Sequence, residues 1–206
     1  MSHFGNDFYT NKVDKKTNVT LPNMNIKETE LKGCFIITPS LFEDSRGYFY
    51  ESFNKKAIEE VIGYPLNFVQ DNQSQSSHGV IRGLHLQTGE HGQAKLVRAI
   101  QGKILDVVVD VQNSSPTYGQ YATFVLSEQN KQQLFVPRGF AHGFCVLSEK
   151  ATIHYKADNY YAPQAESGIV YNDADLNIDW QLPKDKIITS DKDLLLPTLK
   201  EFKHAQ

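Results

Sequence analysis

The sequence predicts a mainly β protein, an antiparallel barrel or sandwich with a few short helices, most of them near the C-terminus. Two observations lead to this prediction. Short runs rich in β-branched and aromatic residues fill the middle of the chain, and glycine or polar turns separate them at near-regular spacing. Helical patterns do not alternate with these runs, which disfavours the βαβ units of a parallel sheet.

Composition favours one soluble domain. The 206 residues are 40% hydrophobic and 22% charged, which suits a single domain with a full core. A net charge of −3 gives no general attraction to nucleic acid, and no apolar run reaches the roughly 18 residues of a membrane helix. Cys34 and Cys145 have apolar neighbours and are expected to be small buried hydrophobic residues. The polar N-terminus lacks the apolar core of a signal peptide, so we expect a cytoplasmic protein.

The chain is expected to begin with a flexible extension, residues 1–24, followed by a single domain, residues 25–206. The extension is polar and rich in Asn, Lys and Thr. The domain begins with strands at 25–31 and 33–42. A turn follows, and alternating aromatic residues then predict a strand at 48–53.

The first helix is predicted over residues 54–62. Asn54 can cap its N-terminus, and Gly63 can end it. Its apolar stripe is formed by Ala57, Val61 and Ile62.

Strands dominate the middle of the chain. We expect them within residues 94–100, 102–111, 121–127, 133–139, 140–148, 151–161 and 167–173. The run LDVVVDV is continuously apolar between Asp106 and Asp110, which predicts a central strand that is buried on both faces or lies at a dimer seam. From Trp180 the chain contains more Pro and Lys, and its LLLPTLKEF segment is expected to form short helices.

Two segments carry the chemistry. VIRGLHLQTGEHGQAKLVR contains Arg82, His85, Lys95 and Arg98, and FVPRGFAHGF contains His142. Their alternating apolar residues and glycines fit side chains aimed into the mouth of a small β-barrel. A cavity lined by cations and a base suits an anionic substrate that bears a carbonyl group.

His85 is the first candidate for a catalytic base. A single histidine in a strand is usually structural, but two cations lie near this one in the sequence. A hairpin could bring Arg82, His85 and Lys95 onto one wall, and the two cations would then keep the imidazole neutral, as a general base requires.

His142 lies in P-x-G-x-x-H, the second signature box of the cupin barrels. Metal-dependent cupins place two histidines and a carboxylate in their first box. Here Gln87 occupies the second histidine position, and Lys95 would repel a metal ion. The sequence therefore predicts no metal site, and His142 is expected to contact substrate or to line the pocket.

Tyr155 could donate a proton, because polar neighbours suggest that its strand borders a wet cavity. The alternative for this tyrosine is a place in the core. Arg46, Glu51, Gln70 and Asn72 are either loop residues or substrate contacts, since an arginine after a turn suits a diphosphate.

Eight segments in this order resemble the dTDP-4-dehydrorhamnose 3,5-epimerases: DSRGYFYESFN, FVQDN, IRGLHLQ, QAKLVR, SPTYGQY, FVPRGFAHGF, HYKADNYY and YNDADLNIDW. The resemblance covers residues 26–200 and implies a metal-free cupin jelly roll. It implies that His85 is the base, that Lys95 stabilises the enolate and that Tyr155 is the acid. It also implies that Asp193 orients His85, with Asp191 as the alternative.

The resemblance further implies a substrate, a dTDP-linked 4-keto-6-deoxy sugar, and no cofactor. It implies a homodimer that works in dTDP-L-rhamnose synthesis. The alternatives are a 3- or 5-epimerase that inverts one centre, a 3,4-ketoisomerase, a sugar-binding cupin without catalysis, and a metal-dependent cupin. The residues implied to hold the nucleotide sugar are Arg46, Glu51, Gln70, Asn72, Arg82, His142, Tyr161 and Glu166.

Overall fold

The computed structural model describes residues 18–202, which form a mainly β fold as predicted. The strands are β1 (Asn18–Leu21), β2 (Met24–Glu28), β3 (Phe35–Pro39), β4 (Phe42–Asp44), β5 (Gly47–Phe49), β6 (Gln70–Ser77), β7 (Ile81–Gln87), β8 (Lys95–Gln101), β9 (Lys103–Asp110), β10 (Tyr121–Ser127), β11 (Gln133–Val136), β12 (Phe140–Val146), β13 (Lys150–Ala157) and β14 (Glu166–Gly168). The helices are α1 (Lys55–Ile62) and α2 (Asp191–Leu194), with 3₁₀ turns η1 (Gly89–His91), η2 (Pro163–Ala165) and η3 (Lys184–Lys186). None of these helices is long and apolar enough to cross a membrane.

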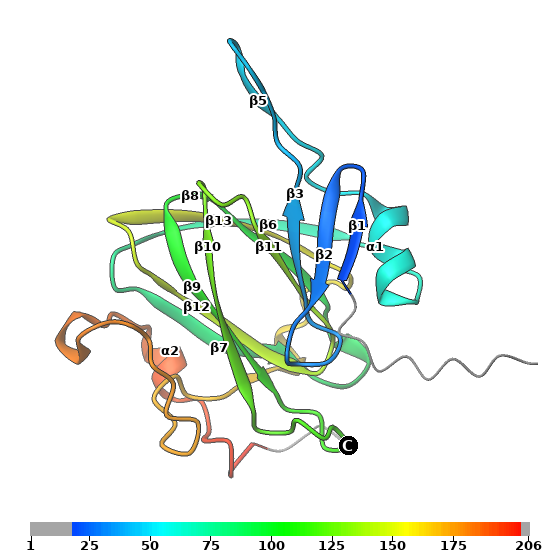
Figure 1. The fold of residues 1–206 in the computed structure, drawn as a ribbon. Helices are drawn as coiled ribbons and strands as arrows, with labels where there is room; N and C mark the ends of the chain where they lie inside the picture. Colours follow the sequence, from blue (N-terminus) through cyan, green and yellow to red (C-terminus); the bar gives the residue numbers. More distant parts are fainter. Residues whose placement is uncertain (1–17, 203–206) are drawn as a thin grey trace, which may run out of the picture.

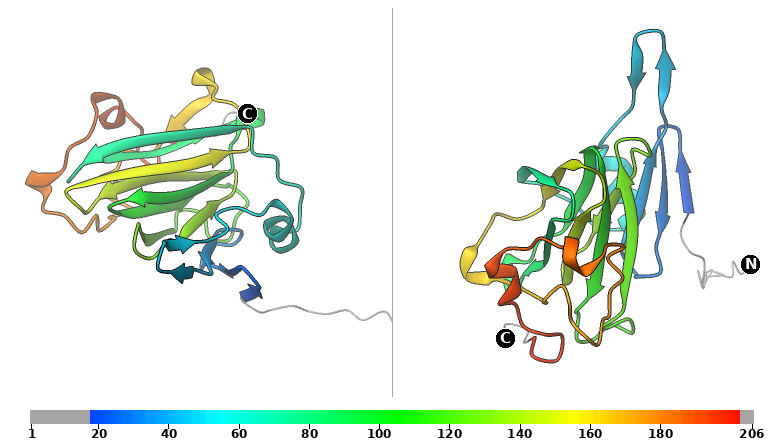
Figure 2. Two further views of the ribbon diagram at one scale, coloured as in Figure 1. Left: turned by 90° about the horizontal axis from the view of Figure 1, so that it is seen from above. Right: turned by 90° about the vertical axis from the view of Figure 1, so that its left-hand side faces the viewer.

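Two antiparallel sheets face each other around a shared core (Figures 1 and 2). The larger sheet has seven strands in the order β1-β2-β3-β11-β8-β13-β6, and the smaller has five in the order β10-β9-β12-β7-β14. Val97 of the larger sheet and Val108 and Phe144 of the smaller belong to the same buried cluster. Residues on the two inner faces therefore point into one interior, as in a jelly roll.

Strand β9 confirms the buried central strand that its sequence predicts. It lies between β10 and β12, and its residues Val107, Val108 and Val109 are completely buried. Val108 faces the core between the sheets, whereas Val107 and Val109 face a second core on the opposite side of the smaller sheet. A strand covered on both faces needs apolar residues at successive positions, which explains the absence of alternation.

Helix α1 is also confirmed. The Asn54 side chain accepts a hydrogen bond from the Ala57 amide at 3.1 Å, and Gly63 ends the helix in the left-handed region with φ 81°. Ile58 packs into an apolar cluster with Phe35 and Phe135 of the larger sheet. The helix thereby covers the outer face of that sheet.

The C-terminal segment covers the outer face of the smaller sheet (orange and red in Figure 1). Leu176, Trp180 and Phe202 pack there beside Val107. Residues 195–202 form turns rather than the predicted helices, and the short helix α2 precedes them. The segment thus brings α2, which is distant in sequence, back to the barrel.

Strand β6 is not predicted by the sequence, because its residues QDNQSQSS carry no apolar alternation. It pairs with β13 at the edge of the larger sheet. One of its faces lines the cavity described below, through Asn72 and Ser74. Because the face that lines the cavity is polar, the sequence of this strand lacks the apolar alternation by which strands are predicted.

The N-terminal region differs from its expected form in two places. Residues 1–17 of the expected extension lie outside the described residues, whereas Asn18–Leu21 pair with β2 as an ordered strand. The strand expected at 48–53 ends at Phe49, within a hairpin formed by β4 and β5. This hairpin projects from the barrel (Figure 2) and exposes its aromatic side chains, since Phe49 remains 68% exposed.

Candidate active site

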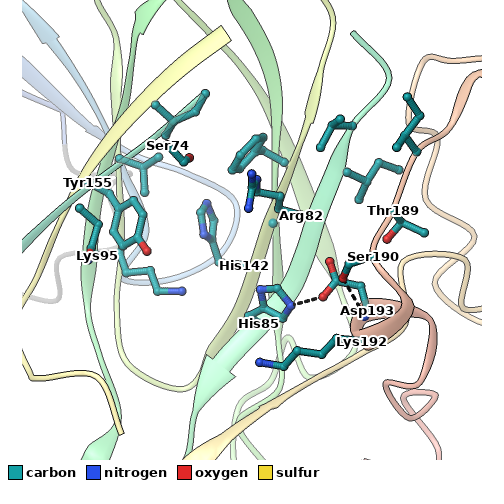
Figure 3. A pocket seen from close by; sticks show the side chains of 18 of the residues that line it. Ser74, Arg82, His85, Lys95, His142, Tyr155, Thr189, Ser190, Lys192 and Asp193 are labelled. Atoms are coloured by element: carbon teal, nitrogen blue, oxygen red, sulfur yellow. Dashed lines mark hydrogen bonds and ion pairs between the residues drawn. The ribbon is translucent and has the colours of Figure 1, made fainter. Parts of the chain in front are cut away.

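A cavity of about 600 Å³ lies between the two sheets. Strands β6, β8 and β13 of the larger sheet form one wall, β7 and β12 of the smaller sheet form the other, and residues 188–193 close one side. Figure 3 shows that the side chains of both walls point toward one another. The polar lining consists of Asn72, Gln73, Ser74, Arg82, His85, Lys95, His142, Tyr155, Thr189, Ser190, Lys192 and Asp193.

A bulge in β7 turns both Arg82 and His85 toward the cavity. Residues three positions apart would point to opposite faces of a regular strand. Here His85 pairs with His142 and Arg82 pairs with Phe144, so β7 holds one more residue than β12 in this interval. Gly83 permits it: its φ is 130°, and a Cβ there would lie 2.6 Å from the Gly143 Cα.

His85 forms a hydrogen bond with Asp193. Its Nε2 lies 2.7 Å from Asp193 Oδ1, and the aspartate, only 4% exposed, is carried by α2. Since a carboxylate accepts, Nε2–H donates and Nδ1 keeps its lone pair. Burial lowers the pKa of His85, Asp193 opposes this change, and Lys95 adds to it. The imidazole is thus neutral near pH 7 and can act as a base.

Asp193, not Asp191, contacts the histidine. The Ser190 side chain caps α2 by accepting a hydrogen bond from the Asp193 amide, and Asp191 is exposed. The Asp193 carboxylate also accepts a longer hydrogen bond, 3.4 Å, from the Gly83 amide.

His142 forms a second histidine–aspartate pair on the same wall. Its Nε2 lies 2.9 and 3.1 Å from the two carboxylate oxygens of Asp106. Asp106 is completely buried on β9, and His142 is 8% exposed at the cavity. The smaller sheet therefore presents two imidazoles to the cavity, each with a carboxylate behind it.

Lys95 and Tyr155 occupy the opposite wall, on β8 and β13 (Figure 3). Desolvation lowers the pKa of Lys95 to about 8, although Asp106 and Glu166 raise it. Burial raises the pKa of Tyr155, while Arg82 lowers it. At neutral pH the lysine is charged and the phenol holds its proton, so this wall supplies N–H and O–H donors.

The expectation that one hairpin places Arg82, His85 and Lys95 on one wall is wrong. Strand β7 belongs to the smaller sheet and β8 to the larger, so the chain crosses between the sheets. His85 therefore faces Lys95 and Tyr155 across the cavity instead of lying beside the lysine. The separation leaves room for a ligand between them.

The cavity rim gathers four further predicted residues. The Tyr161 hydroxyl donates to Glu166 at 2.6 Å, and the Gln70 side chain bonds both Asn72 and the Tyr161 amide. Lys192, which was not predicted, donates to Glu166 at 2.7 Å. Partial burial raises the pKa of Glu166, but the hydrogen bonds from Lys192 and Tyr161 lower it overall.

Arg46 and Glu51 lie away from this cavity. Arg46 is in the projecting hairpin and pairs with Asp44, while Glu51 accepts hydrogen bonds from Asn23 and Asn54 beside α1. Neither residue lines the cavity of its own chain, and the hairpin that carries Arg46 extends away from the barrel (Figure 1).

Comparison with known proteins identifies the family. A family model described as dTDP-4-dehydrorhamnose 3,5-epimerase matches residues 28–201. The Escherichia coli K12 enzyme of that name is 49% identical over 179 residues, which cover 87% of this chain and 96% of that protein. The chain belongs to the dTDP-4-dehydrorhamnose 3,5-epimerase family.

Solved structures of the family agree with the fold. The dTDP-4-dehydrorhamnose 3,5-epimerase of Elizabethkingia anophelis gives a TM-score of 0.84 at 51% identity, covering 87% of this chain and 98% of its own. A dTDP-6-deoxy-D-glucose-3,5-epimerase of Legionella pneumophila, solved with dTDP-4-keto-L-rhamnose, gives 0.84 at 44% identity, covering 89% and 99%. The family match includes each cavity residue named above.

Gln87 shows how this epimerase uses the position where a metal-dependent cupin has a second histidine. Its amide donates to the carbonyls of His91 and Tyr160 and accepts from the Ala162 amide. The side chain thus anchors the rim loop that carries Tyr161. The described residues contain no group of three or more His, Cys, Asp or Glu side chains placed to hold a metal ion.

Sequence reasoning missed three residues of the site. Asp106 was read only as the boundary of an apolar run, and Lys192 was given no role in the site. Ser76, on the unpredicted strand β6, accepts a hydrogen bond from Arg82 Nε at 3.0 Å. A buried-strand pattern flanked by a carboxylate was the one available signal for Asp106.

Proposed function

We propose that this chain inverts C3 and C5 of dTDP-4-dehydro-6-deoxy-D-glucose, forming dTDP-4-dehydro-L-rhamnose. The observation that supports this best is the placement of an imidazole with its carboxylate on one sheet and a phenol on the other. Inverting a carbon centre requires a proton to leave one face and another to arrive on the opposite face. A base and an acid on facing walls provide this arrangement.

His85 is the proposed base. Its Nδ1 takes the proton from the carbon beside the C4 ketone, the C–H electron pair forms the enolate double bond, and O4 takes the negative charge. The Lys95 ammonium, which is itself desolvated, stabilises that charge from the other wall. Asp193 holds Nε2–H and offsets the charge of the imidazolium that forms.

Tyr155 is the proposed acid. Its hydroxyl gives a proton to the opposite face of the same carbon, the ketone reforms, and the ring carbon is inverted. The resulting tyrosinate and the His85 imidazolium return to their starting states by proton exchange with solvent. Because only protons move, the scheme needs neither a cofactor nor a metal.

The remaining predicted residues are proposed to bind the nucleotide sugar. Arg82 presents a planar guanidinium suited to diphosphate oxygens, and His142 lies beside His85 on the wall. The rim tyrosine Tyr161 offers an exposed ring on which a base could stack, with Glu166 holding its hydroxyl. Gln70 and Asn72 complete the rim.

A homodimer is proposed as the working form. Arg46 and Glu51 can contact a sugar nucleotide only if they approach the cavity of a second copy, since they lie outside their own. The exposed aromatic residues of the β4–β5 hairpin, such as Phe49, would become buried against the second copy. Sedimentation analysis tests this: a monomer at micromolar concentration with full activity would rule it out. The proposed location remains the cytoplasm.

The test of the function is incubation with dTDP-4-dehydro-6-deoxy-D-glucose in D₂O, with the incorporated deuterium located by NMR. Deuterium at both C3 and C5 of an inverted product is the expected result. Deuterium at one centre would replace the proposal with a single-centre epimerase. Binding of the substrate without any label would favour a binding protein without catalysis.

A further inference from the structure

Arg82 is an arginine of the cavity whose charge has no carboxylate partner. In the described part of the chain, Arg46 and Arg138 each form an ion pair with an aspartate, whereas Arg82 forms none. Its guanidinium points into the cavity (Figure 3) and, like that of any arginine in a protein, stays charged. A charged guanidinium that no carboxylate occupies is suited to bind an anion.

A serine holds this guanidinium from the other sheet. The Arg82 Nε donates to Ser76 Oγ at 3.0 Å, the only hydrogen bond of the arginine side chain within residues 18–202. Because Nε lies at the base of the guanidinium, the terminal nitrogens Nη1 and Nη2 keep their protons for a ligand. Fixing Nε also fixes the plane of the group, and with it the direction in which these two nitrogens point.

Ser76 contacts Arg82 without lining the cavity itself. It is 7% exposed near the end of β6, in the larger sheet, whereas Arg82 lies near the start of β7, in the smaller sheet. The connection between the two strands is held in place, since the amides of His78 and Gly79 donate to backbone carbonyls of other segments. Ser76 is absent from the lining of the cavity, so it would act on a ligand through the guanidinium.

We propose that Ser76 is a positioning residue for the reaction, which orients Arg82 so that both terminal guanidinium nitrogens bind the diphosphate of the sugar nucleotide. The proposal rests on the function proposed above. Phosphate oxygens match a planar guanidinium through two parallel hydrogen bonds. A side chain that is already oriented loses less conformational entropy when it binds, so the serine raises affinity without touching the ligand.

The position of Arg82 matters because the proposed base lies on the same strand. Arg82 and His85 both reach the cavity from β7, on either side of the bulge at Gly83. A diphosphate held by Arg82 therefore fixes one end of the sugar nucleotide relative to the imidazole. Ser76 thereby helps to place the sugar ring next to the base.

The first test compares Ser76→Ala with Ser127→Ala. Ser127 is a matched control: it is 5% exposed, and its Oγ accepts a hydrogen bond from the Asn130 amide at the end of β10. We expect the Kd for dTDP, measured by calorimetry, to rise about 10-fold in Ser76→Ala, since a hydrogen bond from a charged group is lost. Ser127→Ala should keep the wild-type Kd.

The kinetic constants and a conservative variant complete this test. In Ser76→Ala, KM should rise in step with the Kd while kcat stays within about twofold of wild type, because the diphosphate is bound equally before and during the reaction. Ser76→Thr keeps the hydroxyl and should restore the affinity for dTDP. An unchanged Kd in Ser76→Ala, or an equal rise in Ser127→Ala, would overturn the proposal.

The second test asks whether the serine acts through the arginine. In an Arg82→Met background, Ser76→Ala should raise the Kd for dTDP by less than about twofold further, because the group that it positions is gone. Thymidine, which lacks the diphosphate, should bind equally to wild type and Ser76→Ala in an NMR titration. Additive losses in the double variant, or equal weakening of thymidine binding, would overturn the proposal.

These binding measurements are separate from the test of the function. Wild-type protein that fails to label the substrate in D₂O would refute the epimerase function, and the coupling between Ser76 and Arg82 in dTDP binding would still decide the role of the serine. Wild-type protein that does not bind dTDP would overturn the proposal directly.

Discussion

The two sheets that enclose the cavity present different chemistry to it. On the smaller sheet each imidazole has a buried carboxylate partner, Asp193 for His85 and Asp106 for His142. On the larger sheet Lys95 and Tyr155 line the cavity through an amine and a phenol, and none of the hydrogen bonds described for them joins them to a carboxylate. One wall thus holds its imidazoles through hydrogen bonds to carboxylates, whereas burial has the largest effect on the groups of the other wall.

This difference explains why the same cavity can remove and return protons. A carboxylate partner makes an imidazole a better proton acceptor without leaving a lone positive charge after the transfer. Burial without such a partner lowers the pKa of Lys95 to about 8 and raises that of Tyr155, so both remain protonated at neutral pH. The predictions below test each wall in turn.

Removal of the base should have the largest effect. His85→Ala is expected to lower kcat about 10⁴-fold, because the variant loses the imidazole that is proposed to accept the proton and that Asp193 holds in place. Binding of dTDP, measured by calorimetry, should change little. Substantial turnover in this variant, with deuterium still entering the sugar, would remove the smaller sheet from its role in proton abstraction.

Tyr155→Phe tests the opposite wall. We expect the rate of inversion to fall about 10²–10³-fold, since the phenyl ring keeps the packing but cannot donate a proton. His85 can still take a proton and return deuterium to the same face. NMR in D₂O should therefore show labelled substrate of unchanged configuration. Loss of labelling in step with inversion would mean that the tyrosine is needed for proton abstraction as well.

The difference between the walls also marks how far the sequence could predict the site. His85, Lys95 and His142 lie in short segments with recognisable spacing, so their place in one cavity was predictable. The bulge that turns Arg82 and His85 to the same face depends on the close approach of Gly83 to Gly143 of strand β12. The chain crosses from one sheet to the other between His85 and Lys95, so these residues face each other instead of lying side by side. Local spacing does not encode this, because strand pairing is a long-range property.

The two carboxylates that contact the histidines were harder to predict from the sequence. Asp193 is 108 positions from His85, and its role followed from the family resemblance rather than from its own surroundings. Asp106 was not predicted, because a single sequence does not distinguish a carboxylate buried within a strand from one that marks the end of an apolar run. Strand β6 went unpredicted for a related reason: Asn72 and Ser74 face the cavity, and a functional polar face lacks the apolar alternation that marks a strand.

Lys95→Met separates activity from stability on the larger sheet. We expect kcat to fall about 10²-fold, because the enolate oxygen loses a charged donor. We also expect the free energy of unfolding at pH 7 to rise by about 1–3 kcal/mol, since the variant no longer buries an amine whose pKa drops from 10.5 to about 8. Denaturant titration measures the second effect, and a destabilised variant would contradict it.

The pH profile of the wild-type enzyme follows from the same two walls. On the acid side kcat/KM should rise with pH as His85 loses its proton, at a pH below the ordinary histidine value because burial lowers its pKa. On the alkaline side kcat/KM should fall through about pH 8, where Lys95 loses its proton. Lys95→Met should lack this alkaline limb, and a limb that persists there would assign it to another group.

The smallest effect is expected at the rim, where Lys192 donates to Glu166 beside the carboxylate-backed wall. Lys192→Met should change the free energy of unfolding by less than about 1 kcal/mol, because its side chain is 63% exposed and water screens the pair. We expect KM to rise a few-fold with kcat unchanged, since Glu166, which accepts a hydrogen bond from the Tyr161 hydroxyl, then loses the hydrogen bond from Lys192 that helps to hold it.

Lys200→Met provides the matched control for this rim prediction. Lys200 forms another surface ion pair, with Asp175, and neither residue lines the cavity. The two variants should therefore lose similar stability, and only Lys192→Met should raise KM. A fall in kcat for Lys192→Met would show that this lysine supports the neighbouring Asp193 and the base, and the carboxylate-backed wall would then extend to the rim.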